Sequence, residues 1–204
     1  MTRLIRLSLI WLAIPLLLIS FIRIQPQAES SEDTIVKLRL METTDLHGYL
    51  IPYNFFNRKM SNRYGLAFTA RLIKQARGQV KNSMLFDNGD LLNGSLVDDY
   101  VRFKGLKKGK IHPVYRAMNK LDYDAATVGN HDFNVGLDFM KRAIKGANFP
   151  YVNANVYYDD GDLYPENDRN YFKPYLIMPR TFVDTEGKKH TIKVGVIGFT
   201  LPQT

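Results

Sequence analysis

The chain has 204 residues, enough for one domain of ordinary size, and its 45% hydrophobic content allows a buried core. It has no cysteine, which excludes a disulfide scaffold, a thiolate metal site and a cysteine nucleophile. Any metal ion must therefore be held by His, Asp, Glu or Asn. The formal net charge of +8 points to a nucleic-acid partner only if the basic residues gather on one surface.

The first 28 residues carry three arginines and no acid, and an almost purely apolar run extends from Leu7 to Ile22. This pattern is typical of a secretory signal, with Ala28 as the candidate residue before cleavage. An uncleaved N-terminal anchor is the alternative, although the run is shorter than the ~20 residues of a membrane span. Residues 29–34 are then an exposed leader. The protein is expected to be exported, to the periplasm, the medium or the cell surface.

Beyond the leader, strand and helix patterns alternate. Val36, Leu38 and Leu40 alternate with Lys37, Arg39 and Met41, which predicts a half-buried strand running into Asp45. Apolar residues at helical spacing predict a helix over Gly65–Val80, followed by a short buried strand, Ser83–Phe86, that ends at Asp87.

The second half of the chain continues the alternation. Helices are predicted at His112–Leu121 and Gly136–Lys145, strands at Asp124–Val128, Tyr151–Asn155 and Ile192–Phe199, a loop at Asp159–Asn170, and a hairpin turn at Asp184–Gly187 after a strand at Thr181–Val183. Repeated strand–loop–helix units predict an α/β domain with helices packed on the faces of a sheet.

Polar residues follow three predicted strands where each strand ends. They are Thr44-Asp45-Leu46-His47-Gly48, Asp87-Asn88-Gly89-Asp90 and Gly129-Asn130-His131-Asp132. One such motif alone is more often a cap or a turn. Three of them, each after its own buried strand, predict convergence at one edge of the sheet, where α/β folds gather their ligands.

Two carboxylates, two imidazoles and one carboxamide would then meet, a ligand set that suits Zn²⁺, Mn²⁺ or Fe²⁺. A carboxylate such as Asp90 can bridge two ions. Two ions about 3.5–4 Å apart can activate a shared hydroxide and bind the oxygens of a phosphoryl centre. The residues therefore predict hydrolysis of a phosphoester without a covalent intermediate.

In this order the three motifs resemble those of the calcineurin-like metallophosphoesterases. Longer segments resemble the exported nucleotidase branch, and within it the bacterial bifunctional 2′,3′-cyclic-nucleotide 2′-phosphodiesterase/3′-nucleotidases: residues 44–48, 87–95, 112–119, 129–134 and 149–155. The resemblance covers about residues 35–204. It implies a β-sandwich flanked by helices (four-layer αββα), of which this chain holds the N-terminal part and is incomplete at its C-terminus.

The resemblance also implies roles. Asp45 and His47 bind the first of two divalent ions (Zn, Mn, Co or Fe), Asp90 bridges both, and Asn130 binds the second. His131 sits beside the phosphate and stabilises the transition state or assists the leaving oxygen, as an imidazole next to two cations can. The implied activity is hydrolysis of 2′,3′-cyclic nucleotides and 3′-nucleotides in extracytoplasmic nucleotide salvage.

Substrate-binding residues are less clearly indicated. Asn88 and Asn155 are the candidates, and Asn155, with Asn153, either lies near the site or caps a fourth strand. His112, before Pro113, is expected to be structural, and His190, beyond the hairpin turn, to be exposed to solvent.

Two departures from the family pattern matter. Relatives that act as 5′-nucleotidases usually carry Asp three positions after the catalytic His, where this chain has Asn134. This favours the cyclic-phosphodiesterase subgroup and leaves open what orients His131, with Asp132 adjacent in sequence. The family's further His ligands and its C-terminal nucleotide-specificity domain come from later segments, so this fragment alone is expected to be inactive.

Two alternatives stay open: a 5′-nucleotidase or UDP-sugar hydrolase on the same scaffold, and a truncated, non-catalytic fragment. Nucleotides are the expected partners. No nucleic-acid polymer is expected, because three of the positive charges lie in the export segment and the cluster Lys104–Lys110 lacks the interleaved aromatics of a strand-binding surface. Membrane contact is expected only through an uncleaved N-terminal segment.

Overall fold

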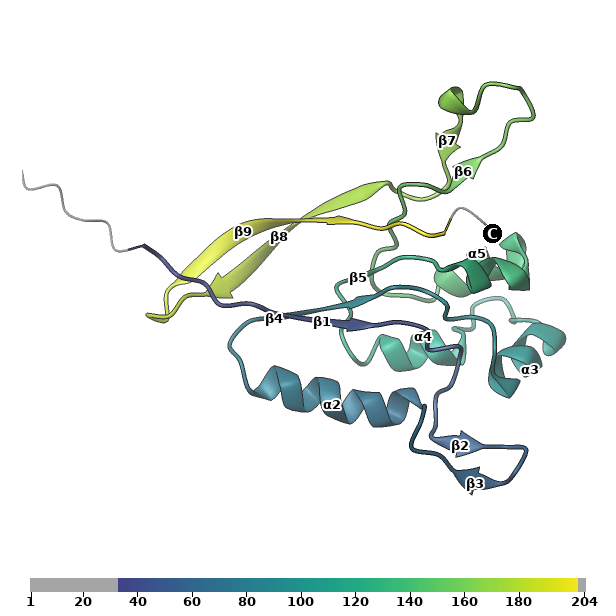
Figure 1. The fold of residues 1–204 in the computed structure, drawn as a ribbon, viewed down its shortest axis with the longest axis horizontal. Helices are drawn as coiled ribbons and strands as arrows, with labels where there is room; N and C mark the ends of the chain where they lie inside the picture. Colours follow the sequence, from purple (N-terminus) through teal and green to yellow (C-terminus); the bar gives the residue numbers. More distant parts are fainter. Residues whose placement is uncertain (1–32, 202–204) are drawn as a thin grey trace, which may run out of the picture. The chain divides into compact units, whose positions relative to one another are not determined.

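The computed structural model describes residues 33–201 (Figure 1). The predicted export segment, residues 1–28, lies outside this range, as does the leader up to residue 32. The described residues belong to one compact unit that begins at Thr34. In this part of the chain no helix is both long and apolar enough to cross a membrane.

The centre of the fold is a parallel sheet of three strands in the order β1-β4-β5: β1 (Arg39–Thr43), β4 (Ser83–Asp87) and β5 (Ala125–Ala126). The register pairs Arg39 with Ser83 and Thr43 with Asp87. Because the strands run in one direction, their C-terminal ends meet at one edge, as the sequence predicts.

The segment between β1 and β4 holds a small hairpin and a helix: β2 (Tyr53–Asn54), β3 (Lys59–Met60) and α2 (Leu66–Gly78). The helix lies within the predicted range and buries Leu66 and Ile73. The hairpin was not predicted, since strands of two residues are too short for an alternating pattern.

Two helices connect β4 to β5: α3 (Leu96–Lys104) and α4 (Pro113–Met118). Only α4 was predicted. The sequence of α3 shows no clear helical periodicity, because the apolar residues Tyr100 and Phe103 are exposed and do not lie on the buried face. Its start is nevertheless well capped, since the Ser95 hydroxyl accepts a hydrogen bond from the Asp98 N–H at 3.1 Å.

After β5 the chain forms a 3₁₀ turn and a helix, η2 (Asn130–Val135) and α5 (Leu137–Ile144). The predicted strand Tyr151–Asn155 is wrong as a regular element, because it pairs only through single bridges, Ala126 to Tyr151 and Val152 to Lys173. The predicted loop Asp159–Asn170 follows β6 (Tyr157–Tyr158) and contains two short elements that were not predicted, η3 (Pro165–Asn167) and β7 (Arg169–Asn170).

The chain then forms a long antiparallel hairpin, β8 (Tyr175–Val183) and β9 (Lys189–Ile197). The predicted turn is present, but both strands begin earlier than their patterns indicate. His190 is not simply exposed as predicted. Its Nε2 lies 2.7 Å from Asp184 Oδ2, because the turn folds the Asp184 carboxylate back onto β9.

The core has two parts, one on each face of the sheet. One cluster joins Leu85 to buried residues of α2, α4 and α5, and the other joins Met84 to Met178 and Phe182 of the β8–β9 hairpin. In Figure 1, α2 and α4 lie on one side of β1 and β4, and the hairpin lies on the other. Leu40 of the edge strand β1 stays 65% exposed, since the hairpin covers β4 rather than β1. Helices, a parallel sheet and a β-hairpin thus form successive layers, which confirms the predicted α/β fold class.

Candidate metal centre

Backbone hydrogen bonds join the loops after β1 and β4 beyond the last residues of the strands. The Asp45 N–H donates to the Gly89 carbonyl at 3.1 Å, and the His47 N–H donates to the Asp90 carbonyl at 2.9 Å. The two loops therefore run side by side, and side chains far apart in sequence are held together.

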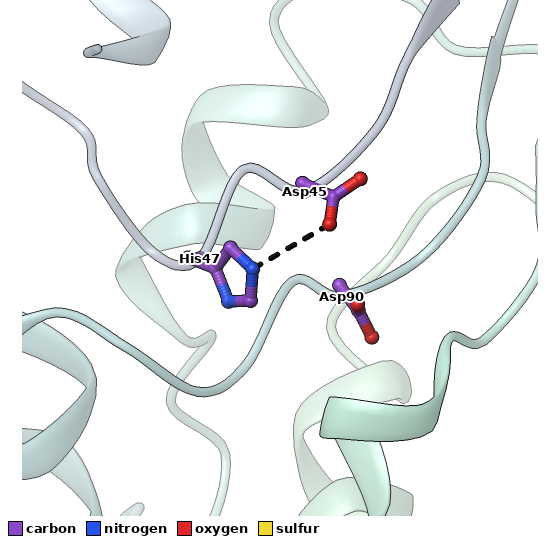
Figure 2. Close-up of side chains that lie close together, drawn as sticks. All are labelled: Asp45, His47 and Asp90. Carbon is purple, nitrogen blue, oxygen red and sulfur yellow. Dashed lines mark ion pairs between the residues drawn. The ribbon is translucent and has the colours of Figure 1, made fainter. Parts of the chain in front are cut away.

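Asp45, His47 and Asp90 form a cluster at this edge (Figure 2). Each offers one ligand atom, and these atoms lie within 4.8 Å of one another. His47 Nε2 is 3.6 Å from Asp45 Oδ1. Asp90 is buried, whereas His47 is half-buried and Asp45 is exposed, so the cluster opens to solvent on one side.

The orientation of His47 suits a metal ligand. Its Nδ1 lies 2.5 Å from the Asn93 carbonyl oxygen, which can only accept a hydrogen bond. Nδ1 must therefore carry a proton, and Nε2, which faces Asp45, is the ring nitrogen available to a metal ion. A histidine fixed through its second nitrogen in this way is the usual arrangement around protein-bound metal ions.

The backbone of the cluster is strained. Asp45, His47 and Asp90 have φ values of 53°, 44° and 57°, and they are three of the five non-glycine residues with positive φ in the described part of the chain. Each such residue costs on the order of 1–3 kcal/mol, which the surrounding structure must offset. Strain of this kind is typical of functional sites.

The loop after β5 joins the same edge. The His131 N–H donates to Asp90 Oδ1 at 2.8 Å, so the third motif is tied to the second. A Cβ at Gly129 would lie 2.2 Å from that same oxygen, and only glycine permits this approach.

Asp132 secures this junction and does not orient His131. Its Oδ1 accepts hydrogen bonds from the N–H groups of Leu91 (2.8 Å) and Leu92 (2.9 Å). Its Oδ2 accepts from those of Asp90 (3.0 Å) and Gly129 (2.9 Å). Burial raises the pKa of Asp132 despite these bonds. Sequence reasoning missed this role, although an acid in the first turn after Gly129 fits a capping position.

His131 lies close to the cluster, with its ring centroid 5.4 Å from that of His47. Its Nδ1 is 3.0 Å from the Nδ2 of Asn134. An amide NH₂ can only donate, so Nδ1 accepts and the ring proton sits on Nε2. The residue that contacts the His131 ring is therefore Asn134.

The other predicted residues differ in their surroundings. Asn130 starts η2 and is half-buried, and its amide makes no hydrogen bond to another described residue. Asn88 is exposed at the end of β4. Asn155 uses both ends of its amide on the backbone of Thr200, at 2.7 and 2.9 Å, and Asn153 is fully buried. Both side chains therefore hold neighbouring segments together, Asn155 through Thr200 and Asn153 through the Thr127 hydroxyl.

The electrostatics of the edge favour a cation. Burial, with a smaller contribution from the charges of Asp132 and Asp45, raises the pKa of Asp87 to about 7. Among the described residues no Lys or Arg forms an ion pair with these acids or with Asp90. A cluster of carboxylates without a Lys or Arg partner, beside a histidine whose Nε2 faces them, fits divalent metal ions.

Comparison with known proteins agrees with this geometry. The chain belongs to the calcineurin-like phosphoesterase family, whose model matches residues 38–201. It is 47% identical over 174 residues to the 2′,3′-cyclic-nucleotide 2′-phosphodiesterase/3′-nucleotidase of Yersinia enterocolitica, covering 85% of this chain and 26% of that protein. It is 29% identical over 184 residues to a 5′-nucleotidase of Vibrio parahaemolyticus, covering 88% of this chain and 28% of that protein.

Among solved structures, the calcineurin-like phosphoesterase YfkN of Bacillus subtilis superposes with a TM-score of 0.77 at 40% identity, covering 84% of this chain and 50% of that one. The chain thus spans about a quarter of the length of the curated relatives it matches. The metallophosphoesterase fold expected from the three motifs is confirmed.

Proposed function

We propose that this chain is part of a metal-dependent phosphoesterase that hydrolyses 2′,3′-cyclic nucleotides and 3′-nucleotides. The observation that carries the proposal is the convergence of Asp45, His47 and Asp90 within 4.8 Å at the ends of β1 and β4. The family membership of the chain gives this cluster its chemical class.

The donor set fits two divalent ions, with Asp45 and His47 on the first, Asp90 shared, and Asn130 on the second. In support, His47 is held through Nδ1 so that its Nε2 faces Asp45, and the half-buried Asn130 amide has no hydrogen-bond partner among the described residues. When bound, the ions would supply Lewis acidity at phosphorus and an activated water. The strained loops after β1 and β4 hold the ligands in place before the ions bind.

His131 would hold a proton at Nε2 and donate a hydrogen bond from it to an oxygen of the substrate phosphate or of the leaving group, where negative charge develops. The Asn134 amide supports this role because it fixes the other ring nitrogen as an acceptor. An imidazole that already carries a proton on the nitrogen facing the substrate needs no change of tautomer before the transition state.

The substrate class rests on two observations. Asn134 stands where the 5′-nucleotidase pattern has an acid, and identity to the cyclic phosphodiesterase/3′-nucleotidase of Yersinia enterocolitica is 47%, against 29% to the Vibrio 5′-nucleotidase. We therefore favour the cyclic and 3′-nucleotides over the 5′-nucleotidase or UDP-sugar alternative. Export of the protein is part of the proposal and rests on the sequence of residues 1–28.

The test is phosphate release by the full-length protein with Mn²⁺, from 2′,3′-cyclic AMP, 3′-AMP and 5′-AMP in parallel. We expect kcat/KM for the first two to exceed that for 5′-AMP. Equal or faster turnover of 5′-AMP would refute the substrate class, and no release from any of the three would refute the enzyme.

A further inference from the structure

A second pair of ionisable residues lies beneath the metal centre and takes no part in the chemistry proposed above. Asp98 on α3 is 2% exposed, and His112, just before α4, is fully buried. Both carboxylate oxygens of Asp98 and the Nε2 of His112 have no hydrogen-bond partner among the described residues. Burying such groups is costly, so a pair kept here calls for an explanation.

The two residues face each other. The His112 Nδ1 accepts a hydrogen bond from the Val114 N–H at 3.4 Å and so caps α4. The ring proton is then on Nε2, which points at Asp98 Oδ1 across 3.7 Å. Burial lowers the pKa of His112 to about 4 and raises that of Asp98 to about 7. The two groups face each other at a distance longer than a hydrogen bond, so His112 confines the Asp98 side chain by contact.

The third member of this arrangement is Gly48, the residue after His47. A Cβ at Gly48 would lie 1.7 Å from Asp98 Oδ2 and 2.1 Å from its Cγ. The Asp98 carboxylate thus fills the space that any side chain at position 48 would need. It packs directly on the backbone of the loop that carries His47.

The chain that leads into α3 contacts His47 from the same side. The Asn93 carbonyl fixes the ring through Nδ1 at 2.5 Å, and a Cβ at Gly94 would approach His47 Cβ to 3.0 Å. Residues 93–98 therefore form one continuous support under His47 and Gly48.

We propose that Asp98, oriented by His112, is a positioning residue for the metal centre, which sets the place of His47 through its contact with Gly48. The inference rests on the proposed metal site but on no particular substrate. Its consequence is that positions 48 and 98 are coupled: a side chain can be added at 48 only if the carboxylate at 98 is removed.

The test compares metal affinity in four forms of the full-length protein: wild type, Gly48→Ala, Asp98→Ala and the double variant. Co²⁺ binding is followed by visible absorption, Mn²⁺ binding by calorimetry, and the fold by thermal unfolding in EDTA. We expect Gly48→Ala to weaken binding by about 10–100-fold, as displacement of a supporting residue does at metal sites, and Asp98→Ala to weaken it by about 10-fold. The double variant should bind about 10-fold more tightly than Gly48→Ala.

Gly105→Ala is the matched control. Gly105 has a φ of 73°, close to the 64° of Gly48, but a Cβ there would meet no atom within 4 Å. It therefore imposes similar backbone strain without the clash, and metal affinity should stay within about twofold of wild type because no ligand-supporting contact changes. Asp98→Asn, which keeps the shape of the side chain, serves if Asp98→Ala fails to fold, and should bind metal more tightly than Gly48→Ala.

Three outcomes would overturn the inference: a double variant no better than Gly48→Ala, an equal loss in Gly105→Ala, or unchanged affinity in Asp98→Ala. If the wild type binds no metal, both the proposed metal centre and the positioning role of Asp98 are refuted. If metal binding follows the predicted order but no nucleotide is hydrolysed, the proposed substrate is wrong and the positioning role stands.

Discussion

Two regions of the molecule differ in their backbone conformation. One is the edge of the sheet with Asp45, His47 and Asp90, and the other is the β8–β9 hairpin. At the edge, the three proposed ligand residues have positive φ, and Asp87 and Asp132 are buried next to them. In the hairpin, nine residue pairs stay in regular register, and only Gly187 in its turn has a positive φ. The hairpin also buries one acid, Asp184, but there His190 pairs with it, and no non-glycine residue of the hairpin has a positive φ. Backbone strain and acids without a basic partner are therefore what distinguish the edge, as is typical of a functional region.

The largest effect is expected from Asp90→Asn. The carbonyl oxygen of the introduced amide could still accept the His131 N–H bond, so the loops should stay joined while the shared metal-binding carboxylate is lost. We expect the variant to retain its fold but to lose bound metal and phosphoesterase activity, measured by plasma emission spectrometry and phosphate release. Asp184→Asn in the hairpin is the control and should keep both, and normal metal content in Asp90→Asn would contradict the assignment.

His131→Ala should lower kcat by about 10²–10⁴, the usual contribution of a positioned acid or base. Metal content should stay at the wild-type level, because His131 is proposed to act on the substrate and not on the ions. His190→Ala, in the hairpin, is the matched control and should leave kcat unchanged. A near-normal rate in His131→Ala would remove this residue from the mechanism.

Asp132→Asn tests whether Asp132 stabilises the fold by joining the loops after β4 and β5. One carboxylate oxygen would become an NH₂ group facing the N–H donors of Asp90 and Gly129, so two charge-assisted bonds would be lost. We expect the free energy of unfolding in EDTA to fall by about 3 kcal/mol, at roughly 1.5 kcal/mol for each bond. Urea unfolding measures it, with the exposed Asp138→Asn as control. A change as small as that of the control would show that Asp132 does not secure the two loops.

The smallest effect is expected from Asp184→Asn in the hairpin. The bond from His190, and those from the Lys188 and Glu186 N–H groups, hold the pKa of Asp184 below its usual value. Its stabilising contribution is therefore present above the unfolded pKa of about 4 and is lost as the pH falls through the lower folded value. The variant should have a lower Tm at pH 7, and the difference should shrink below pH 4.

Thermal unfolding from pH 3 to 7 measures this dependence. Glu186→Gln, which changes an exposed ion pair in the same turn, should show a smaller loss at pH 7. If the Tm difference between wild type and Asp184→Asn stays constant down to pH 3, the predicted pH dependence is wrong. If Asp184→Asn loses metal affinity, the hairpin is not independent of the proposed metal centre.

The sequence predicted the parallel strands, α2, α4, α5 and the hairpin turn because each follows a local apolar period or turn signal. It could not predict how far the hairpin extends or which face of β1 stays exposed, since both depend on long-range packing against Met84. The meeting of the three motifs at one edge could be predicted, because parallel strands end on the same side of a sheet. It could not show that Asp132 binds two loops, that Asn134 contacts His131, or that Asp98 packs on Gly48, because these contacts depend on backbone angles that no spacing reveals.

The most direct measurement of the central claim is the dependence of phosphate release from 3′-AMP on bound metal in the full-length protein. After removal of metal by EDTA and dialysis, the rate should fall to background, and Mn²⁺ should restore it in wild type but not in Asp90→Asn. Undiminished hydrolysis in the metal-free protein, or full restoration in Asp90→Asn, would contradict the proposal that the loops after β1, β4 and β5 hold the ions that drive the reaction.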